Sequence, residues 1–254
     1  MNFLELMKIE LIKARRSRIV PLLFIAPLLV VSSGVASLSR YLTPEYTSAW
    51  PAMFIQSALV YAYYLLPLSM IVVCAMLEGR ETMNRGIVKM LTLPVSRRAL
   101  SLAKFCVIAL YLVMELAVFF FVFAFAGAIA VRTAGISEAM PVSYLLGWCA
   151  KLFLTMLPCA AVMHAITTLI ERPLISAGIN LALVIPGVLA ANTPLWVIYP
   201  YCYGGYLVSC SLHEFTAGAG AEAFELFPFL PCAAAVFGAA LAIAAAMFGR
   251  KEMR

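Results

Sequence analysis

Three ionisable side chains fall inside apolar stretches of this sequence that are long enough to cross a membrane: Glu115, Lys151 and His164. An ionisable residue within a span is unfavourable without a partner, so each is a candidate for function. At a rise of about 1.5 Å per residue, Glu115 lies roughly 15 Å and His164 roughly 9 Å from the inner end of its span, against roughly 28 Å for Lys151. Glu115 therefore matches the depth of His164 better, and we expect Lys151 to extend to the outer headgroups.

The chemistry open to these groups is limited. A proton relay needs several acids in series, and Glu115 is the one acid placed clearly within a span, so a proton-driven carrier is disfavoured. A hydrogen bond between packed spans is the simpler role for Glu115. Two histidines, no aspartate and no GxSxG motif leave no paired groups for an intramembrane enzyme. His213 with Glu214 is too sparse for a metal site, and the seven cysteines have no metal-binding spacing.

The most polar stretch on the predicted inner side is residues 78–104. A helix over residues 81–92 gathers four apolar residues on one side: Met83, Ile87, Met90 and Leu91. The opposite side carries Glu81, Arg85, Lys89 and Thr92. An acid that precedes bases at i, i+4 spacing is the favourable order. Pro94 ends this helix, and Ser96 is a good N-cap for the next one. Such a helix either lies on the headgroups as a connection or docks on a cytoplasmic partner.

Composition indicates which elements carry these residues. Of 254 residues, 65% are hydrophobic and only 12% charged, and the mean hydropathy is +1.00. A soluble domain of this length has no room to bury so much apolar surface, so lipid is part of the solvent. Six runs reach or approach the about 20 apolar residues that cross about 30 Å of hydrocarbon. They are residues 19–38, 52–77, 105–131, 142–170, 174–191 and 229–248. Backbone groups in lipid must bond within their own segment, so the predicted fold is all-α with six transmembrane helices.

The basic residues set the topology rather than a nucleic-acid site, because they form short clusters beside the apolar runs. With the N-terminus inside, fifteen Lys and Arg residues lie on the inner side and two on the outer side, which predicts that both termini are cytoplasmic. Residues 1–18 are predicted to form an interfacial amphipathic helix with an apolar stripe of Phe3, Leu4, Met7 and Leu11. Residues 19–254 then form a single transmembrane domain. A cleaved signal peptide is the alternative, but the charged leader and the apolar run are both too long for one.

An aromatic segment separates the fifth and sixth spans, over residues 192–228. Its rings are Trp196, Tyr199, Tyr201, Tyr203, Tyr206, Phe215, Phe224 and Phe227. Aromatic rings with polar tips settle at headgroup depth, so a simple interfacial belt is one interpretation. Cys202 and Cys210 lie in the same segment and are candidates for a disulfide.

These features together resemble the type-2 ABC exporter permeases, and within them most closely the permease subunits of lantibiotic-immunity transporters. The resemblance rests on an N-terminal helix with the sequence KARRSR, six spans, and an inner loop of the form E-x-x-E…N…K-x-L-x-x-P-V-S-R…A-K. The matching loop residues are Glu78, Glu81, Asn84, Lys89, Leu91, Pro94, Val95, Ser96, Arg97, Ala103 and Lys104. The architecture covers the whole chain, and the detailed match covers about 27 residues.

The resemblance implies that the loop is a coupling helix that inserts into a groove of an ATPase. The partner contacts are then expected at Glu78, Glu81, Met83, Asn84, Ile87, Lys89, Met90, Leu91 and Pro94. It also suggests that the outer segment forms short re-entrant helices that close the translocation path.

The same resemblance predicts that ATP hydrolysis and the transport pathway lie on separate subunits. The chain has no G-x-x-x-x-G-K-[ST] motif to hold nucleotide phosphates, so we expect no enzyme activity or cofactor here and ATP on a separate ABC ATPase. A second permease, identical or related, completes the pathway in a bacterial cytoplasmic membrane. The expected task is export of an amphipathic peptide antibiotic. The alternative is a membrane subunit with a structural or signalling role and no transport.

Overall fold

The computed structural model describes residues 3–15, 19–36, 49–83, 96–170, 172–217 and 224–250, and these form helices and short connections without a strand. Six of the helical stretches are long and apolar enough to span a membrane. They are Ile19–Ala36, Ala49–Gly79, Arg97–Thr133, Val142–Leu169, Pro173–Ala191 and Leu226–Phe248. The all-α, six-span prediction is therefore confirmed. The largest difference in bounds is at the third span, whose helix begins at Arg97 rather than near residue 105.

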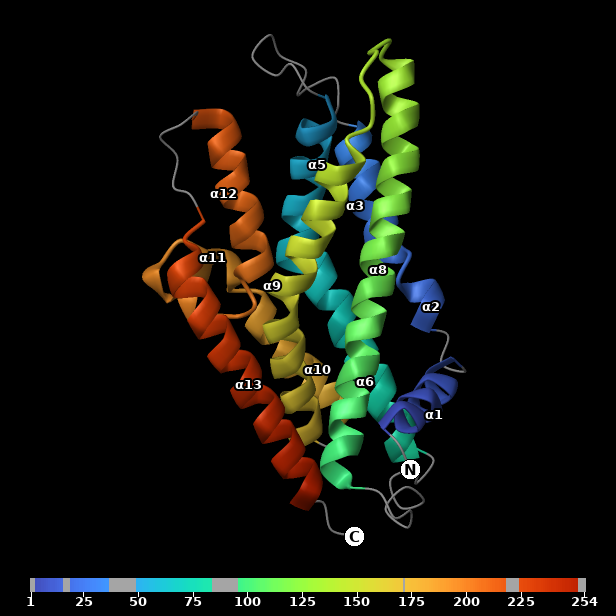
Figure 1. Cartoon of the computed structure of the whole chain (residues 1–254), viewed down its shortest axis with the longest axis vertical. Coiled ribbons are helices and arrows are strands. Elements are labelled where there is room, and N and C mark those ends of the chain that lie inside the picture. Colours follow the sequence, from blue (N-terminus) through green and yellow to red (C-terminus); the bar gives the residue numbers. More distant parts are fainter. Residues whose placement is uncertain are drawn as a thin grey trace.

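The N-terminal region comprises α1 (Phe3–Arg15), α2 (Ile19–Leu22) and α3 (Ile25–Ala36). Helix α1 lies against the first part of α8 (Arg97–Thr133) rather than continuing into the first span (Figure 1). The buried face of α1 centres on Leu6 and Glu10, at 2% and 5% exposure, whereas Phe3 and Leu4 are exposed. Packing on α8 thus uses a face of α1 that lies beside the predicted apolar stripe, and contact of that stripe with lipid stays a prediction.

The second span is one unbroken helical path of three parts: α5 (Ala49–Val60), the π-helical η1 (Tyr61–Leu65) and α6 (Leu66–Met83). A π turn within an α-helix is rare and often occurs at functional positions. Here it places the fully buried Tyr61 ring on Phe119 of α8, with centroids 4.5 Å apart. Helix α6 continues past the hydrocarbon-length stretch to Met83, so the predicted inner loop is shorter than residues 78–104.

The centre of the bundle is α9 (Val142–Leu169), which packs against α13 (Leu226–Arg250), α8 and α6. Helix α3 packs on α8 and α5. Close approach of the helices depends on small residues, as is usual within membranes. A Cβ on Gly127 of α8 would lie 2.6 Å from the Trp50 ring. Any larger residue at position 127 therefore has to displace α5 or its indole.

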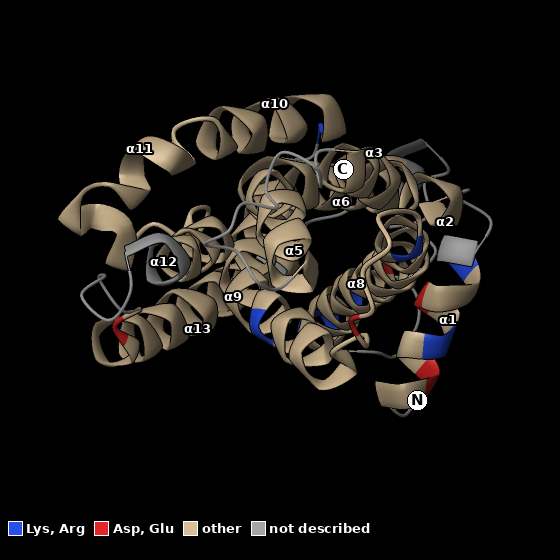
Figure 2. Cartoon of the chain, turned by 90° about the horizontal axis from the view of Figure 1, so that it is seen from above, with Lys and Arg blue, Asp and Glu red and all other residues tan. Residues whose placement is uncertain are grey.

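The fifth span is formed by α10 (Pro173–Val184) and the short α11 (Gly187–Ala191), followed by η2 (Pro194–Val197) and α12 (Tyr203–Ala217). Helix α10 packs on α6, and α12 packs on α5, η1 and α9. Seen from above, α10 and α11 lie on one side of the bundle and α13 on the other (Figure 2). Helices α10 and α11 contain no charged residue, and α13 contains one, Arg250, at its end.

The orientation of the bundle stays a prediction that a reporter can test. Helix α1, the start of α8 and the end of α13 lie at one end of the molecule (Figure 1), which is also the end rich in Lys and Arg. A reporter fused after Arg254 or inserted beside Arg85 should be active as a cytoplasmic protein, and one beside Gly218 as an external protein. The positions are compared by paired reporters that are active on opposite sides of the membrane. An external C-terminus would contradict the topology.

Candidate functional site

The predicted coupling loop is held between two helical stems, α6 and α8. Ser96 caps α8 as expected: its hydroxyl accepts a hydrogen bond from the Ala99 amide at 3.2 Å. Glu81 and Met83 belong to the last turn of α6. The other predicted contact residues, Asn84, Ile87, Lys89, Met90, Leu91 and Pro94, lie outside the described residues. The structure therefore describes the base of the loop, where α6 ends and α8 begins.

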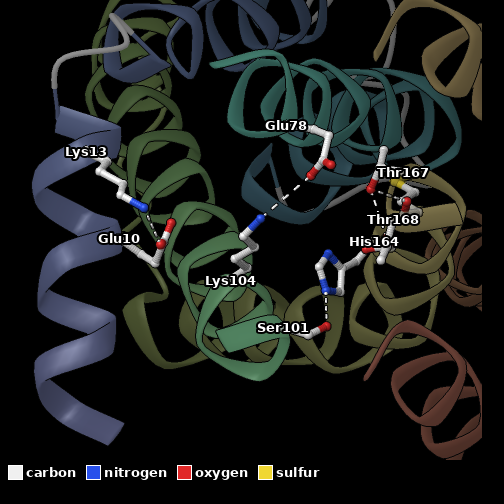
Figure 3. Close-up of polar contacts among 9 residues, drawn as sticks. Glu10, Lys13, Glu78, Ser101, Lys104, His164, Thr167 and Thr168 are labelled. Atoms are coloured by element: carbon white, nitrogen blue, oxygen red, sulfur yellow. Dashed lines mark hydrogen bonds and ion pairs between the residues drawn. The ribbon is translucent and has the colours of Figure 1, made fainter. Parts of the chain in front are cut away.

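At this base, Glu78 of α6 and Lys104 of α8 form an ion pair, with the Lys104 Nζ 3.8 Å from the Glu78 carboxylate (Figure 3). Both residues are buried, at 6% and 8% exposure. The Lys104 ammonium also lies 4.6 Å from the centre of the Phe248 ring of α13. Because α8 begins at Arg97, Lys104 lies two turns into this helix and its side chain is packed within the bundle. One lysine thus contacts the last helix and both stems of the loop.

A second acidic residue, Glu10 of α1, approaches the same place from the N-terminal helix. Its carboxylate pairs with Lys13 at 2.8 Å (Figure 3). Glu10, Glu78, Lys104 and His164 together line a cavity of about 20 Å³. A cavity of that size accommodates about one water molecule, and these side chains supply the polar partners that a buried water requires. Glu10 of the amphipathic helix therefore lines the same small cavity as residues of both loop stems, and Leu6 of this helix packs on α8.

His164 completes the cavity from α9. One ring nitrogen, Nε2, lies 3.2 Å from the Ser101 hydroxyl of α8, a hydrogen bond between the third and fourth spans. The hydroxyls of Thr167 and Thr168 donate to the His164 carbonyl at 2.9 and 2.8 Å. His164 is 3% exposed. Its partners are thus within the bundle, and its place beside the Glu78–Lys104 pair was not visible from its sequence position.

These residues form one unit, which we call the stem cluster: Glu10, Glu78, Ser101, Lys104 and His164. Four helices, α1, α6, α8 and α9, contribute to it. Buried charges of this kind are strongly destabilising when one partner is removed. The cluster therefore couples the positions of the four helices at the end of the bundle that carries the loop. Sequence reasoning included Glu78 and His164 among the site residues but missed Glu10 and Ser101.

Glu115 lies apart from this cluster. Ser69 of α6 donates a hydrogen bond to its carboxylate, and Tyr61 of η1 lies beside it. Glu115 is fully buried. The carboxylate thus joins the second and third spans as an interhelical hydrogen-bond acceptor, while His164 bonds to Ser101. The similar depth of Glu115 and His164 does not bring them together as partners.

Part of the outer aromatic segment is packed inside the protein. Trp196, Tyr201 and Tyr203 are buried, and the Tyr201 hydroxyl donates to Asn180 Oδ1 of α10 at 2.7 Å. The Tyr203 hydroxyl donates to the Val197 carbonyl at 2.6 Å. Cys202 and Cys210 are both buried free thiols. The side chains of His213 and Glu214 lie outside the described set.

Close backbone approach holds α12 against the second span. A Cβ on Gly205 would lie 2.2 Å from the Tyr63 ring, so the helix touches η1 directly. The Tyr63 and Ser209 hydroxyls are hydrogen-bonded at 3.0 Å across this contact. Interior packing, rather than an open belt of rings, therefore describes Trp196, Tyr201 and Tyr203, whereas Phe227 is exposed.

Comparison with known proteins gives one family. The family model described as ABC-2 family transporter protein matches residues 6–187, from α1 to the start of α11. The match includes all five residues of the stem cluster and the whole of the predicted coupling loop. No curated protein matches the chain at a significant level.

Proposed function

The chain belongs to the ABC-2 family of transporter proteins, and from that premise we propose that it is the permease of an exporter that expels an amphipathic peptide antibiotic. Membership makes it a multi-pass membrane component of an ABC transporter, a system that includes an ATPase partner. The substrate, the direction of transport and the pairing of permeases are the parts that we propose.

The observation that carries the coupling proposal is the ion pair between Glu78 and Lys104. It joins α6 and α8, the helices on either side of residues 84–95 in the chain, and the same lysine reaches α13 through Phe248. A loop pushed by an ATPase would then move α6 and α8 together instead of bending one of them. Glu10 and His164 extend this connection to α1 and α9 through the shared cavity.

In the proposed cycle the apolar side of the predicted helix 81–92, whose first three residues belong to the last turn of α6, occupies a groove on the ATPase. ATP is held by two copies of that partner, and closure of the ATPase dimer changes the angle of the coupling helix. The stem cluster passes this change to the spans. A second permease, identical or related, supplies the other half of the pathway.

The outer segment supplies the closing element in this proposal. Helices α11 and α12 with η2 are proposed as the re-entrant part that shuts the path on the outer side. Support comes from the buried aromatic contacts of Tyr201 and Tyr203 and from the tight packing of Gly205 on Tyr63. Irregular backbone at membrane depth is tolerated where protein or water surrounds it, which the proposed role requires of the connection between α11 and α12.

The export proposal is tested in bacterial cells that lack their own immunity genes. Cells producing this permease with its co-purifying ATPase should survive several-fold more of a lantibiotic than cells producing the permease with an ATPase whose P-loop lysine is replaced. The measurement is the inhibitory concentration at equal membrane levels of both subunits. Equal susceptibility of the two strains to a panel of lantibiotics would contradict the substrate assignment, while retained co-purification would leave the subunit pairing intact.

A further inference from the structure

Two tyrosines attach the proposed closing element, α11, η2 and α12, to helix α10 of the fifth span. The Tyr201 hydroxyl donates a hydrogen bond to Asn180 Oδ1 at 2.7 Å, and the Tyr199 hydroxyl donates to the Leu183 carbonyl. The Asn180 amide donates to the Ser176 carbonyl at 2.8 Å, which fixes its oxygen toward the tyrosine. Tyr201 and Asn180 are buried, at 3% and 0% exposure. The closing element is thus bonded back onto a helix that precedes it in the chain.

The Tyr201 hydroxyl lies deep in the span. Asn180 follows Pro173, the first residue of α10, by two turns, so it lies about 10 Å from the inner end of the fifth span at the helical rise. A Cβ on Gly187, at the start of α11, would lie 3.4 Å from the Tyr201 carbonyl oxygen. The ring therefore extends inward along α10, from the depth of Gly187 to that of Asn180. From there α12 rises toward the end of the molecule opposite α1 (Figure 1).

The closing element is held differently on its two sides. Toward the second span, Gly205 packs directly on the Tyr63 ring, and α12 also packs on α5 and α9. Separating these helices would expose closely packed apolar surface. Toward α10, the chain passes through a turn at Ile185 and Pro186, and the proline has no amide hydrogen to bond there. Separation on this side needs a pivot at that turn and the release of the two tyrosine hydroxyls.

We propose that Tyr199, Tyr201 and Asn180 form a latch that keeps the closing element on α10 and the path shut on the outer side. The inference rests on the role proposed above for α11, η2 and α12. Release of the latch leaves the Tyr201 hydroxyl and the Asn180 oxygen without each other, which is unfavourable in apolar surroundings. The latch therefore sets how often the closing element leaves α10 at rest, and a movement of α10 that separates these groups favours opening.

Cys202 is a natural reporter of the latch, because it follows Tyr201 directly and is fully buried. The full chain is tested in right-side-out membrane vesicles without ATP. A charged, membrane-impermeant methanethiosulfonate added outside can react with Cys202 when water enters beside Tyr201, and mass spectrometry of peptides follows the labelling with time. We expect labelling of Tyr201→Phe to be about threefold to twentyfold faster than that of the parent, the range set by interhelical hydrogen bonds in a bilayer protein. Tyr199→Phe should change the rate in the same direction.

Tyr203→Phe is the matched control. It removes the hydroxyl of another fully buried ring, but that hydroxyl bonds to the Val197 carbonyl at 2.6 Å, within the closing element. Cys202 in this variant should be labelled at the parent rate, even where its thermal unfolding resembles that of Tyr201→Phe. Asn180→Leu should accelerate labelling as Tyr201→Phe does, and the double variant should be no faster than the faster single variant, because both remove the same bond.

Parent-rate labelling in both Tyr199→Phe and Tyr201→Phe would overturn the latch. Equal acceleration in Tyr203→Phe would also overturn it, because the loss of any buried hydroxyl would then loosen the segment. Labelling requires neither ATP nor a transported substrate, so these outcomes leave the export proposal intact. Conversely, if the lantibiotic test fails while Tyr201→Phe alone of the two tyrosine variants at positions 201 and 203 is labelled faster, the latch stands and the substrate assignment falls.

Discussion

Ile87→Glu should release the ATPase from this permease and abolish export. The apolar side of the predicted helix 81–92 is expected to enter a groove on the partner, and helices bound in grooves are anchored by residues at i, i+3, i+4 and i+7. Ile87 lies at the middle of that side. A carboxylate there would be buried without a partner, and such a loss at the centre of an interface costs about 2–4 kcal/mol, or a 30- to 1,000-fold weaker complex. The measurement is co-purification of the ATPase, with membrane levels of mutant and parent matched.

The matched control is Thr92→Glu. It adds the same charge to the same helix, but on the side with Glu81, Arg85 and Lys89, which is expected to face water. The ATPase should therefore remain bound in Thr92→Glu. If the helix rests on lipid instead, Ile87→Glu lifts it from the headgroups and the ATPase stays attached through other surfaces. If the ATPase co-purifies undiminished with Ile87→Glu and its ATP hydrolysis is still stimulated by the permease, the docking role of this helix is contradicted.

The spans and the cap of α8 could be predicted because they depend on local properties of the sequence. An apolar run of about 20 residues has few alternatives to a membrane helix. Ser96 acts on an amide three residues away, so the signal and the structure lie in one short segment. The family model supports the same architecture over residues 6–187.

The contacts between distant segments could not be predicted in this way. Glu10 is buried because Leu6, on the same face of α1, packs on Leu100 and Ala103 of α8. Nothing in residues 1–18 alone selects that face over the stripe that begins at Phe3. The one available signal was the i, i+4 spacing of Leu6 and Glu10, which places an acid in line with an apolar anchor.

Depth along a helix was equally insufficient to assign partners. Glu115 and His164 lie at comparable distances from the inner side, yet Glu115 bonds to Ser69 and His164 to Ser101. Depth fixes one coordinate, while the rotation of each helix decides which neighbours its side chains meet. The π turn at Tyr61–Leu65 illustrates the point, because it changes that rotation in a stretch where the apolar pattern is continuous.

Lys104→Met should destabilise the permease by about 3–5 kcal/mol, the usual effect of removing one member of a buried ion pair. Methionine keeps most of the apolar stem beside Phe248, so the loss is one of charge rather than of packing. Glu78 and Glu10 then line a small cavity without the lysine that lies between them. Thermal unfolding in detergent measures the loss, and Arg98→Met, at an exposed position of the same helix, should have little effect.

The double variant Glu78→Gln/Lys104→Met separates stability from coupling. With both charges removed, no buried ion is left unpaired, and a large part of the stability should return because neutral replacements of buried pairs are often tolerated. If the ion pair holds the loop stems together during transport, this variant should bind the ATPase normally yet export poorly for each ATP hydrolysed. The ratio of substrate exported to ATP hydrolysed in vesicles is the informative quantity. A normal ratio in the double variant would show that the stems move together without the pair, and that Glu78 and Lys104 contribute to stability alone.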